Sequence, residues 1–124
     1  MLAGALVASA IIFITLLTIP IPFVHLVTVI PGPFVAGYIG GTVANANEGR
    51  IITFGLFVTA IMVVPAIILL SIGLIAGIEG PLKILLLIAG VSIIPYTWWA
   101  VTIGALISYL IRRRGLSRVT ERPN

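Results

Sequence analysis

Two long stretches of this sequence, residues 51–78 and 84–111, contain no charged residue, and none precedes Glu48. An uncharged apolar run of about 18 or more residues indicates a transmembrane helix, because about 20 residues cross the hydrocarbon core of a bilayer. The whole chain follows this pattern, since 60% of its 124 residues are hydrophobic and 8% are charged. Soluble domains typically carry about 25% charged residues. We therefore predict an integral membrane protein of the all-α class.

Four membrane-spanning helices are predicted. The first, third and fourth are the long apolar runs themselves, while residues 20–50 are too long and too apolar for a simple loop and should hold the second crossing. The N-terminal run has no basic segment before it and is longer than the apolar core of a cleaved signal peptide, so we expect it to be retained as a helix. The four spans lie at about 2–19, 33–47, 51–78 and 84–111.

The distribution of lysine and arginine predicts the orientation of these helices, because cytoplasmic loops and tails carry the excess of both residues. With four crossings, Arg50 and the arginine-rich tail fall on one side of the membrane and Lys83 falls on the other. We expect a four-helix bundle over residues 1–111 in the cell membrane, with both termini cytoplasmic, followed by a basic cytoplasmic tail at 112–124. The tail begins with three residues expected to orient the protein and to attract anionic lipid head groups: Arg112, Arg113 and Arg114. This role explains the basic cluster without nucleic-acid binding.

Two proline pairs, in "IPIPFV" at 19–24 and "IPGPFV" at 30–35, interrupt the chain between the first two predicted helices. Proline removes a backbone donor and disfavours helical conformation in the residue before it. We expect the first pair to end the first helix and the second pair to begin the second, whose first turn tolerates proline. The residues between them would form a short apolar link at the outer interface. The alternative is a re-entrant or substrate-facing loop that carries His25, because broken backbone at membrane depth must be covered by protein or line a cavity.

Small residues are concentrated in the second predicted helix, where Gly37 and Gly41 have the GxxxG spacing and Gly40 lies beside them. Gly73 and Gly77 repeat this spacing in the third helix. Glycines spaced in this way let two helix backbones approach closely, and such packing drives helix association in membranes. We predict that these five glycines pack against other helices, either of this chain or of a second protein.

The third and fourth helices each contain a proline near the middle, Pro65 and Pro95. Each proline weakens a hydrogen bond to the carbonyl four residues earlier. We expect plain kinks, which membrane helices tolerate. The alternative is a pair of breaks whose freed carbonyls line a path for ions or substrate, as in transporters.

Three large aromatic side chains, Tyr96, Trp98 and Trp99, fall deep in the fourth helix. Tryptophan is usual in the interfacial belt of a membrane, and the fourth helix places these rings deeper than that. They either pack within the bundle or contact another subunit, a lipid chain or an apolar cofactor such as a quinone. The indole N–H groups need an acceptor at that depth, which Thr97 or Thr102 would supply.

The sequence contains no set of residues for catalysis or for tight metal binding. His25 is the only histidine and there is no cysteine, whereas a zinc site needs three or four ligands. We expect His25 to be hydrogen-bonded to the backbone, with a single axial haem ligand as the alternative. Glu48, Glu79 and Glu121 fall in predicted loops or in the tail. No enzyme activity, cofactor or metal is therefore predicted.

The run "PGPFVAGYIGG" at 31–41 resembles the "GPFVAGYxGG" stretch of a family of small, mostly archaeal membrane proteins of unknown function. The layout of four spans is similar too. Membership would imply a glycine-rich four-helix membrane protein, and it assigns no chemistry to any residue.

Two functions remain open from the sequence. The first is a non-catalytic accessory or structural subunit that packs into a larger membrane complex through glycine-rich and aromatic helix faces. The second is a small channel or carrier built by self-association, with proline-kinked helices lining the path. Ion pathways usually contain ionisable residues within the membrane, and the predicted spans contain none. We therefore favour the accessory subunit.

Overall fold

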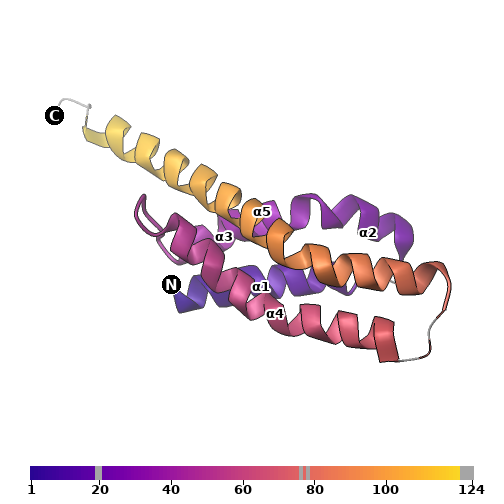
Figure 1. Cartoon of the computed structure of the whole chain (residues 1–124). Coiled ribbons are helices and arrows are strands. Elements are labelled where there is room, and N and C mark those ends of the chain that lie inside the picture. The colour runs from indigo at the N-terminus through magenta and orange to yellow at the C-terminus, as the bar shows by residue number, and fades with distance from the viewer. Residues whose placement is uncertain (19–20, 76, 78, 121–124) are drawn as a thin grey trace.

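The computed structural model describes residues 1–18, 21–75, 77 and 79–120 of the chain. Five helices account for most of these residues and are labelled in Figure 1. They are α1 (Leu2–Leu16), α2 (Pro22–Val29), α3 (Pro31–Val43), α4 (Ile51–Ile75) and α5 (Pro81–Thr120). No strand occurs in the described ranges, so the all-α class predicted from the sequence is confirmed.

Two of these helices have the length and composition of membrane-spanning helices. The stretches Ile51–Ile75 and Pro81–Val119 are long and apolar enough to cross a membrane. The pair Phe23–Val29 and Pro31–Val43, which is bent by 44°, also qualifies when it is counted as one broken span. α1 is apolar but shorter, with 15 residues. The prediction of membrane-spanning helices is therefore confirmed for two helices, or for three with the bent pair.

The long helix α4 is apolar around its whole circumference. Phe54, Val58 and Met62 face the interior and are buried, whereas Ile52 and Leu56 of the same helix are more than half exposed. A soluble protein rarely leaves a large continuous apolar surface open to water. A helix that is apolar on all sides suits an environment of lipid or of other protein.

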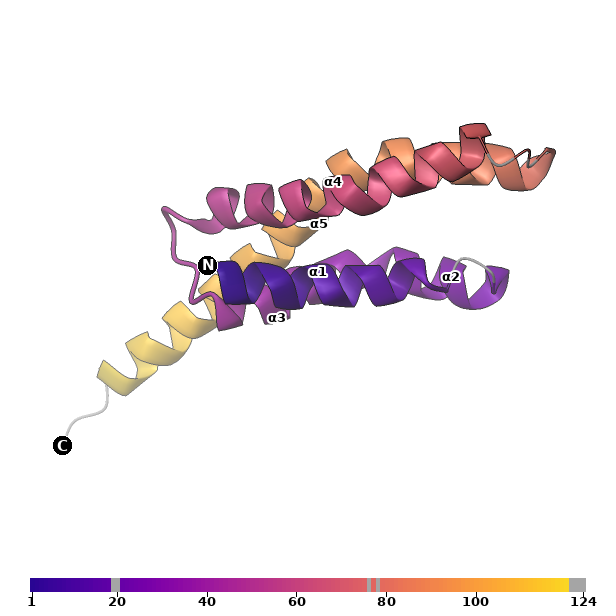
Figure 2. The same cartoon turned by 90° about the horizontal axis from the view of Figure 1, so that it is seen from below.

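The helices run back and forth between two ends of the molecule (Figures 1 and 2). α1 runs away from the N-terminus, α2 and α3 return, α4 runs out again and α5 returns. We call the end that holds the N-terminus and the α3–α4 turn (44–50) the terminal end. The opposite end, with α2 and the start of α5, is the distal end. The last turns of α5 extend beyond the other helices at the terminal end (Figure 1).

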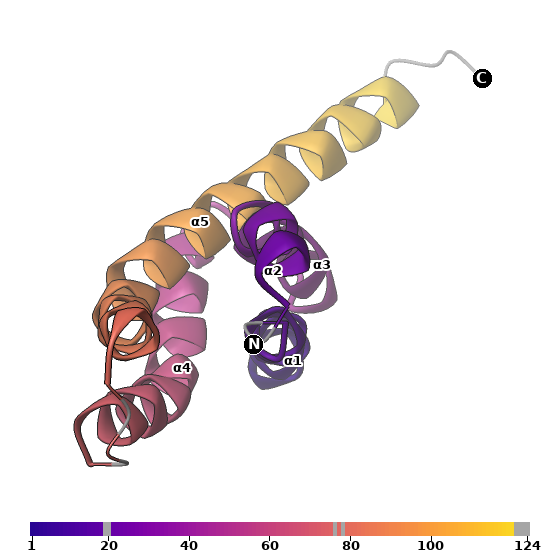
Figure 3. The same cartoon turned by 90° about the vertical axis from the view of Figure 1, so that its right-hand side faces the viewer.

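The core lies where four of the helices meet. α3 packs between α1 and α5, and α4 contacts both α5 and α1; Figure 3 shows this arrangement in a view along the helices. Because many of the buried side chains are small, the helix backbones can approach closely. The buried residues include Ala5, Ala8, Ala36, Phe54, Val58, Val101 and Ala105.

The link predicted between the first two membrane helices is itself helical, as α2. Pro22 and Pro31 lie in the first turns of α2 and α3, where a helix does not use the missing N–H. The second predicted helix therefore begins at Pro31 instead of Pro33. α1 ends at Leu16, and its predicted end at residue 19 lies outside the described residues.

α3 ends at Val43, earlier than predicted, because Asn45 adopts a left-handed conformation with a φ of 50°. The N–H of Asn45 donates to the carbonyl of Thr42, and the N–H of Ala46 donates to the carbonyl of Gly41, both at 3.1 Å. This pair of bonds is the Schellman motif, which satisfies the last carbonyls of a helix. Asparagine is one of the few residues that adopt the left-handed conformation readily.

The last two helices also differ from their predicted bounds. α4 ends at Ile75, and the predicted end at residue 78 lies outside the described residues. α5 begins at Pro81 and continues to Thr120, so the residues predicted as a tail are helical as far as the structure describes them. Arginine is a good helix former, and an arginine-rich segment can continue a helix past the apolar span.

The two mid-helix prolines interrupt neither helix. Pro65 lies inside α4 and Pro95 inside α5, and both helices are continuous through them. In Figure 1, α5 changes direction in its orange middle part, which is the behaviour expected of a proline kink.

Candidate functional site

Glycines hold α3 against α5 along a line that we call the α3–α5 seam, made by Gly37, Gly41, Val101, Gly104 and Ala105. A Cβ atom added to Gly37 would collide with the backbone of Val101, and one added to Gly41 would lie 3.0 Å from the Cα atom of Ala105. A Cβ atom on Gly104 would collide with the backbone of α3. The seam therefore has no space for larger side chains.

Gly40 faces a different neighbour from Gly37 and Gly41. A Cβ atom on Gly40 would lie 2.6 Å from the carbonyl oxygen of Gly4 and 2.7 Å from the Cβ atom of Ala8. These three glycines of α3 thus contact α5 on one side and α1 on the other. α3 is held closely by both of its neighbours within this chain.

The two predicted packing glycines of the third span have different surroundings. A Cβ atom on Gly73 would lie 3.2 Å from Leu87 of α5, so this glycine does lie at a helix contact. Gly77 lies beyond the end of α4, has a φ of 65° and has no atom nearby. Within the described part of this chain Gly77 therefore packs against no helix, because α4 ends before it and the position requires a left-handed conformation.

An aromatic cluster joins α3 to α5 near the α2–α3 bend. The Phe34 ring meets the Trp99 ring edge to face, with centroids 5.6 Å apart, and meets the Tyr96 ring in the same way at 6.4 Å. The Tyr96 and Trp99 centroids are 6.4 Å apart. Trp98 lies instead toward α4, where a Cβ atom added to Gly55 would be 3.5 Å from its ring. The three predicted aromatic residues therefore divide between two neighbouring helices.

Neither indole has a hydrogen-bond acceptor within the described part of the chain. Trp98 is 40% exposed and Trp99 is 54% exposed. Neither Thr97 nor Thr102 accepts a hydrogen bond from them, and the Thr102 hydroxyl is itself buried without a partner. The predicted pairing of the indoles with these threonines is therefore wrong.

Tyr96 connects α5 to the bend between α2 and α3. Its hydroxyl donates to the carbonyl of Ile30, the residue between the two helices, at 2.6 Å. Pro31 and Pro33 have no N–H to donate, so two carbonyls of α2 lose their usual helical donors at this bend. The Tyr96 hydroxyl therefore supplies a hydrogen-bond donor to the backbone at the α2–α3 bend, where the two prolines supply none.

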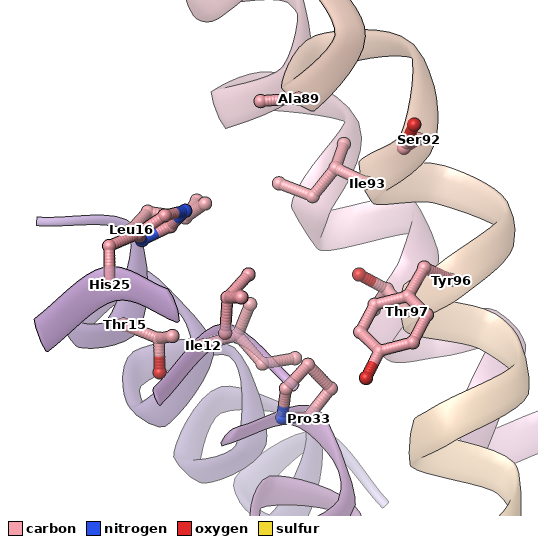
Figure 4. A pocket seen from close by; sticks show the side chains of 11 residues that line it. Ile12, Thr15, Leu16, His25, Pro33, Ala89, Ser92, Ile93, Tyr96 and Thr97 are labelled. Atoms are coloured by element: carbon pink, nitrogen blue, oxygen red, sulfur yellow. The ribbon is translucent and has the colours of Figure 1, made fainter. Parts of the chain in front are cut away.

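A cavity of about 110 Å³ lies next to this bend, between the α1–α3 part of the molecule and α5 (Figure 4). Its walls are mainly aliphatic and include Ile12, Leu16 and Ile93. Its polar residues are Thr15, His25, Ser92, Tyr96 and Thr97. In Figure 4, His25 and Leu16 lie on one side of the space, and Tyr96 and Thr97 project toward it from α5.

The half-buried side chain of His25 contacts the hydroxyl of Thr18. Its Nδ1 atom lies 3.2 Å from the Thr18 hydroxyl, which also lies 3.2 Å from the Thr28 hydroxyl. The predicted hydrogen bond to the backbone is replaced by these side-chain contacts. The sequence did not indicate these side-chain contacts. They depend on how α2 packs beside the end of α1, and the spacing of Thr18 and Thr28 does not show this packing. Among the described residues, no three His, Asp or Glu side chains lie close enough to hold a metal ion.

Pro65 and Pro95 do not face a common space. Pro65 lines a groove between α1 and α4, beside Ser9 and Phe13. Pro95 is exposed on the outside of α5. A path lined jointly by both prolines within one chain, which the sequence left open, is therefore not formed by the described residues.

Arg112 fastens the α3–α4 turn to α5 at the terminal end. Its Nη1 atom donates to the Oδ1 atom of Asn45 at 2.5 Å, and its Nη2 atom donates to the carbonyl of Ala46 at 2.6 Å. Arg113 and Arg114 are exposed. Of the three arginines predicted to attract lipid head groups, Arg112 thus donates hydrogen bonds to the α3–α4 turn of its own chain.

No family model, curated protein or solved structure matches this chain. The resemblance at residues 31–41 therefore stays a prediction, and the function has to be argued from the geometry.

Proposed function

We propose that this chain is a non-catalytic accessory subunit of a larger membrane complex. It crosses the cell membrane four times, with both termini and the basic helical tail in the cytoplasm, and it binds its partner through the aromatic surface of α5. Membrane lipids surround the rest of its apolar surface.

The charge distribution supports this topology. Arg50 in the α3–α4 turn and the arginines at the end of α5 lie at the terminal end, and Lys83 lies at the distal end, where α5 begins. This is the asymmetry expected if the terminal end is cytoplasmic. α1 has 15 residues and spans about 22 Å, which is shorter than the hydrocarbon thickness of about 30 Å. A helix that is shorter than the hydrocarbon core is accommodated by local thinning of the bilayer.

The unpaired indoles of Trp98 and Trp99 carry the proposal of a protein partner. If residues 84–111 are the embedded part of α5, both indoles lie near the middle of the bilayer. Lipid tails offer no acceptor there, and an unpaired polar group in an apolar medium costs on the order of 1–3 kcal/mol. A neighbouring subunit that supplies a carbonyl or hydroxyl oxygen removes this cost.

The aromatic cluster supplies a surface of the right kind for such a contact. Phe34, Tyr96 and Trp99 form a rigid group on α3 and α5, and Trp99 is exposed over about half of its surface. Tyrosine and tryptophan are enriched among the residues that dominate binding energy in protein interfaces. The alternative, a channel or carrier built by self-association, has less support, because the predicted spans contain no ionisable residue of the kind that usually lines an ion pathway.

Mass analysis of the protein purified from its native membranes in mild detergent tests the proposal. We expect a foreign subunit in stoichiometric amount with the wild type and a severalfold lower yield of it with Trp99→Phe. Phe23→Leu is the matched control, because Phe23 is also an exposed aromatic residue (79%) but lies on α2, away from the cluster. A closed homo-oligomer with nothing else bound contradicts the accessory role.

A further inference from the structure

A hollow of about 260 Å³ lies at the terminal end, between the α3–α4 turn and the last turns of α5 (Figure 1). We call it the arginine hollow. Its lining residues are Asn45 and Asn47 of the turn and Tyr109, Arg112, Arg113 and Leu116 of α5. The α5 residues are spaced by three and four positions, so they share one face of that helix. The arginine hollow is separate from the aromatic surface proposed to bind a partner.

Arg112 places a fixed positive charge at this hollow. Two N–H groups of its guanidinium donate to the Oδ1 atom of Asn45 and to the carbonyl of Ala46. Both of these acceptors are neutral. The Nε atom of Arg112 is buried and has no hydrogen-bond partner among the described residues. Because the turn already holds this side chain in place, an anion that binds beside it does not have to order it.

The positive charge of the hollow is not neutralised by the described part of the chain. Arg113 adds a second positive charge and is exposed. Among the described residues, no Asp or Glu side chain forms an ion pair with Arg112 or Arg113. Glu48 lies nearby, 3.5 Å from the Tyr109 hydroxyl, but it does not line the hollow. Two like charges that line one hollow repel each other, and a bound anion removes this repulsion.

The position of the hollow along α5 indicates the kind of anion. Arg112 directly follows the uncharged run that ends at Ile111, and the apolar side chains of Leu110 and Ile111 are exposed just before it. In the proposed topology, the hydrocarbon core ends here, at the cytoplasmic leaflet, which contains anionic lipids. A phospholipid at this depth presents a negative phosphate joined to apolar chains, which matches the order of charged and apolar surface along α5.

The polar groups of the hollow suit a phosphate. Guanidinium groups bind phosphate oxygens through charge-assisted hydrogen bonds, and the side-chain amide of Asn47 is a further donor. A cavity of about 150 Å³ holds benzene, so this hollow has room for a phosphate group. We propose that the arginine hollow binds the phosphate of an anionic phospholipid, whose acyl chains lie against the exposed apolar side chains of α5. This inference rests on the proposed topology and does not require the partner subunit.

Binding is measured by native mass spectrometry of the purified full chain in a neutral detergent, at about 0.15 M ammonium acetate to screen exposed charges. The probe is phosphatidylglycerol. Phosphatidylcholine with the same acyl chains is its control, because both lipids have a phosphate and only the first has a net negative charge. We expect one phosphatidylglycerol to bind about 10-fold more tightly than phosphatidylcholine. Glycerol 3-phosphate, added without lipid, separates the two sources of a phosphate, and we expect it not to bind at the concentrations that saturate phosphatidylglycerol binding.

Two arginine variants distinguish a site from a general attraction between the tail and anionic lipid. Arg113→Gln and Arg114→Gln each remove one positive charge from adjacent exposed positions, and of the two residues only Arg113 lines the hollow. We expect Arg113→Gln to weaken phosphatidylglycerol binding about 10-fold, through the loss of a charge-assisted hydrogen bond. Arg114→Gln should weaken it at most about 3-fold, because its charge acts through screening salt.

A second pair of variants keeps every arginine. Asn47→Asp and Gly49→Asp each add one negative charge to the α3–α4 turn. Asn47 lines the hollow, whereas a Cβ atom added to Gly49 has no atom within 4 Å. We expect Asn47→Asp to weaken phosphatidylglycerol binding about 5-fold, because its carboxylate competes with the phosphate for the arginines, and Gly49→Asp less than about 2-fold. Aspartate has nearly the shape of asparagine, so this pair stays decisive if the loss of an arginine disturbs α5.

Three results overturn the proposal. Equal weakening by the two variants within each pair means that the tail attracts anionic lipid through its overall charge and contains no site. Equal binding of phosphatidylglycerol and phosphatidylcholine means that the hollow does not select an anionic lipid. Binding of glycerol 3-phosphate as tight as that of phosphatidylglycerol assigns the hollow to a soluble phosphate compound. None of these results bears on the accessory role, because the assay contains no partner.

Discussion

At the scale of single residues, glycine has opposite roles at two positions, one in α3 and one in α5. Gly37 lies in the α3–α5 seam, where an added methyl group meets the backbone of Val101. Gly115 lies in the last turns of α5, where an added methyl group meets nothing within 4 Å. The same substitution should therefore have opposite effects on stability at these two positions.

We expect Gly37→Ala to lower the free energy of unfolding by about 1–3 kcal/mol, because the seam has to open to admit the methyl group. Gly115→Ala should raise it by up to about 1 kcal/mol, because alanine has the higher helix propensity. Both values come from denaturation in a mixed-micelle titration followed by circular dichroism. Equal effects of the two substitutions would show that α3 and α5 do not meet at Gly37.

At the scale of elements, the α2–α3 bend depends on a donor from another helix. The Tyr96 hydroxyl reaches the Ile30 carbonyl, and Tyr96→Phe removes this bond and keeps the ring. We expect the amides of α2 to exchange with solvent faster, by a factor equivalent to about 0.5–1.5 kcal/mol. Tyr38→Phe is the control, since Tyr38 is an exposed tyrosine of α3. Unchanged exchange in the Tyr96 variant would mean that α2 holds its position without α5.

At the scale of the whole molecule, the chain has no cysteine, so a single introduced thiol reports on one position. We expect Glu48→Cys and Ser117→Cys to be labelled from the cytoplasmic side and Glu79→Cys from the outer side. Membrane-impermeant reagents applied to intact and to opened cells distinguish the sides. Labelling of positions 48 and 79 from the same side rules out four crossings.

The long apolar runs and the proline pairs allowed the helices to be predicted. The length of an apolar run and the missing N–H of a proline affect only the helix that contains them, so both can be read from the local sequence. Asn45 was a readable signal for the end of α3 that the prediction overlooked. The contacts of Arg112 and His25 were not predictable. α4 and the uncharged middle of α5 are apolar on all sides, so their hydrophobicity contains no pattern that shows which face meets a neighbour. Those contacts depend on how each helix is rotated about its axis.

The adjacent positions of Trp98 and Trp99 have an optical consequence. They are the only tryptophans of the chain, one next to α4 and the other next to Phe34, so all indole fluorescence comes from one short part of α5. Indole emission moves to longer wavelength as its surroundings become more polar, and it is quenched only by molecules that reach the ring. The colour of the light that the protein emits therefore reports on the surface proposed to bind a partner, without any added label.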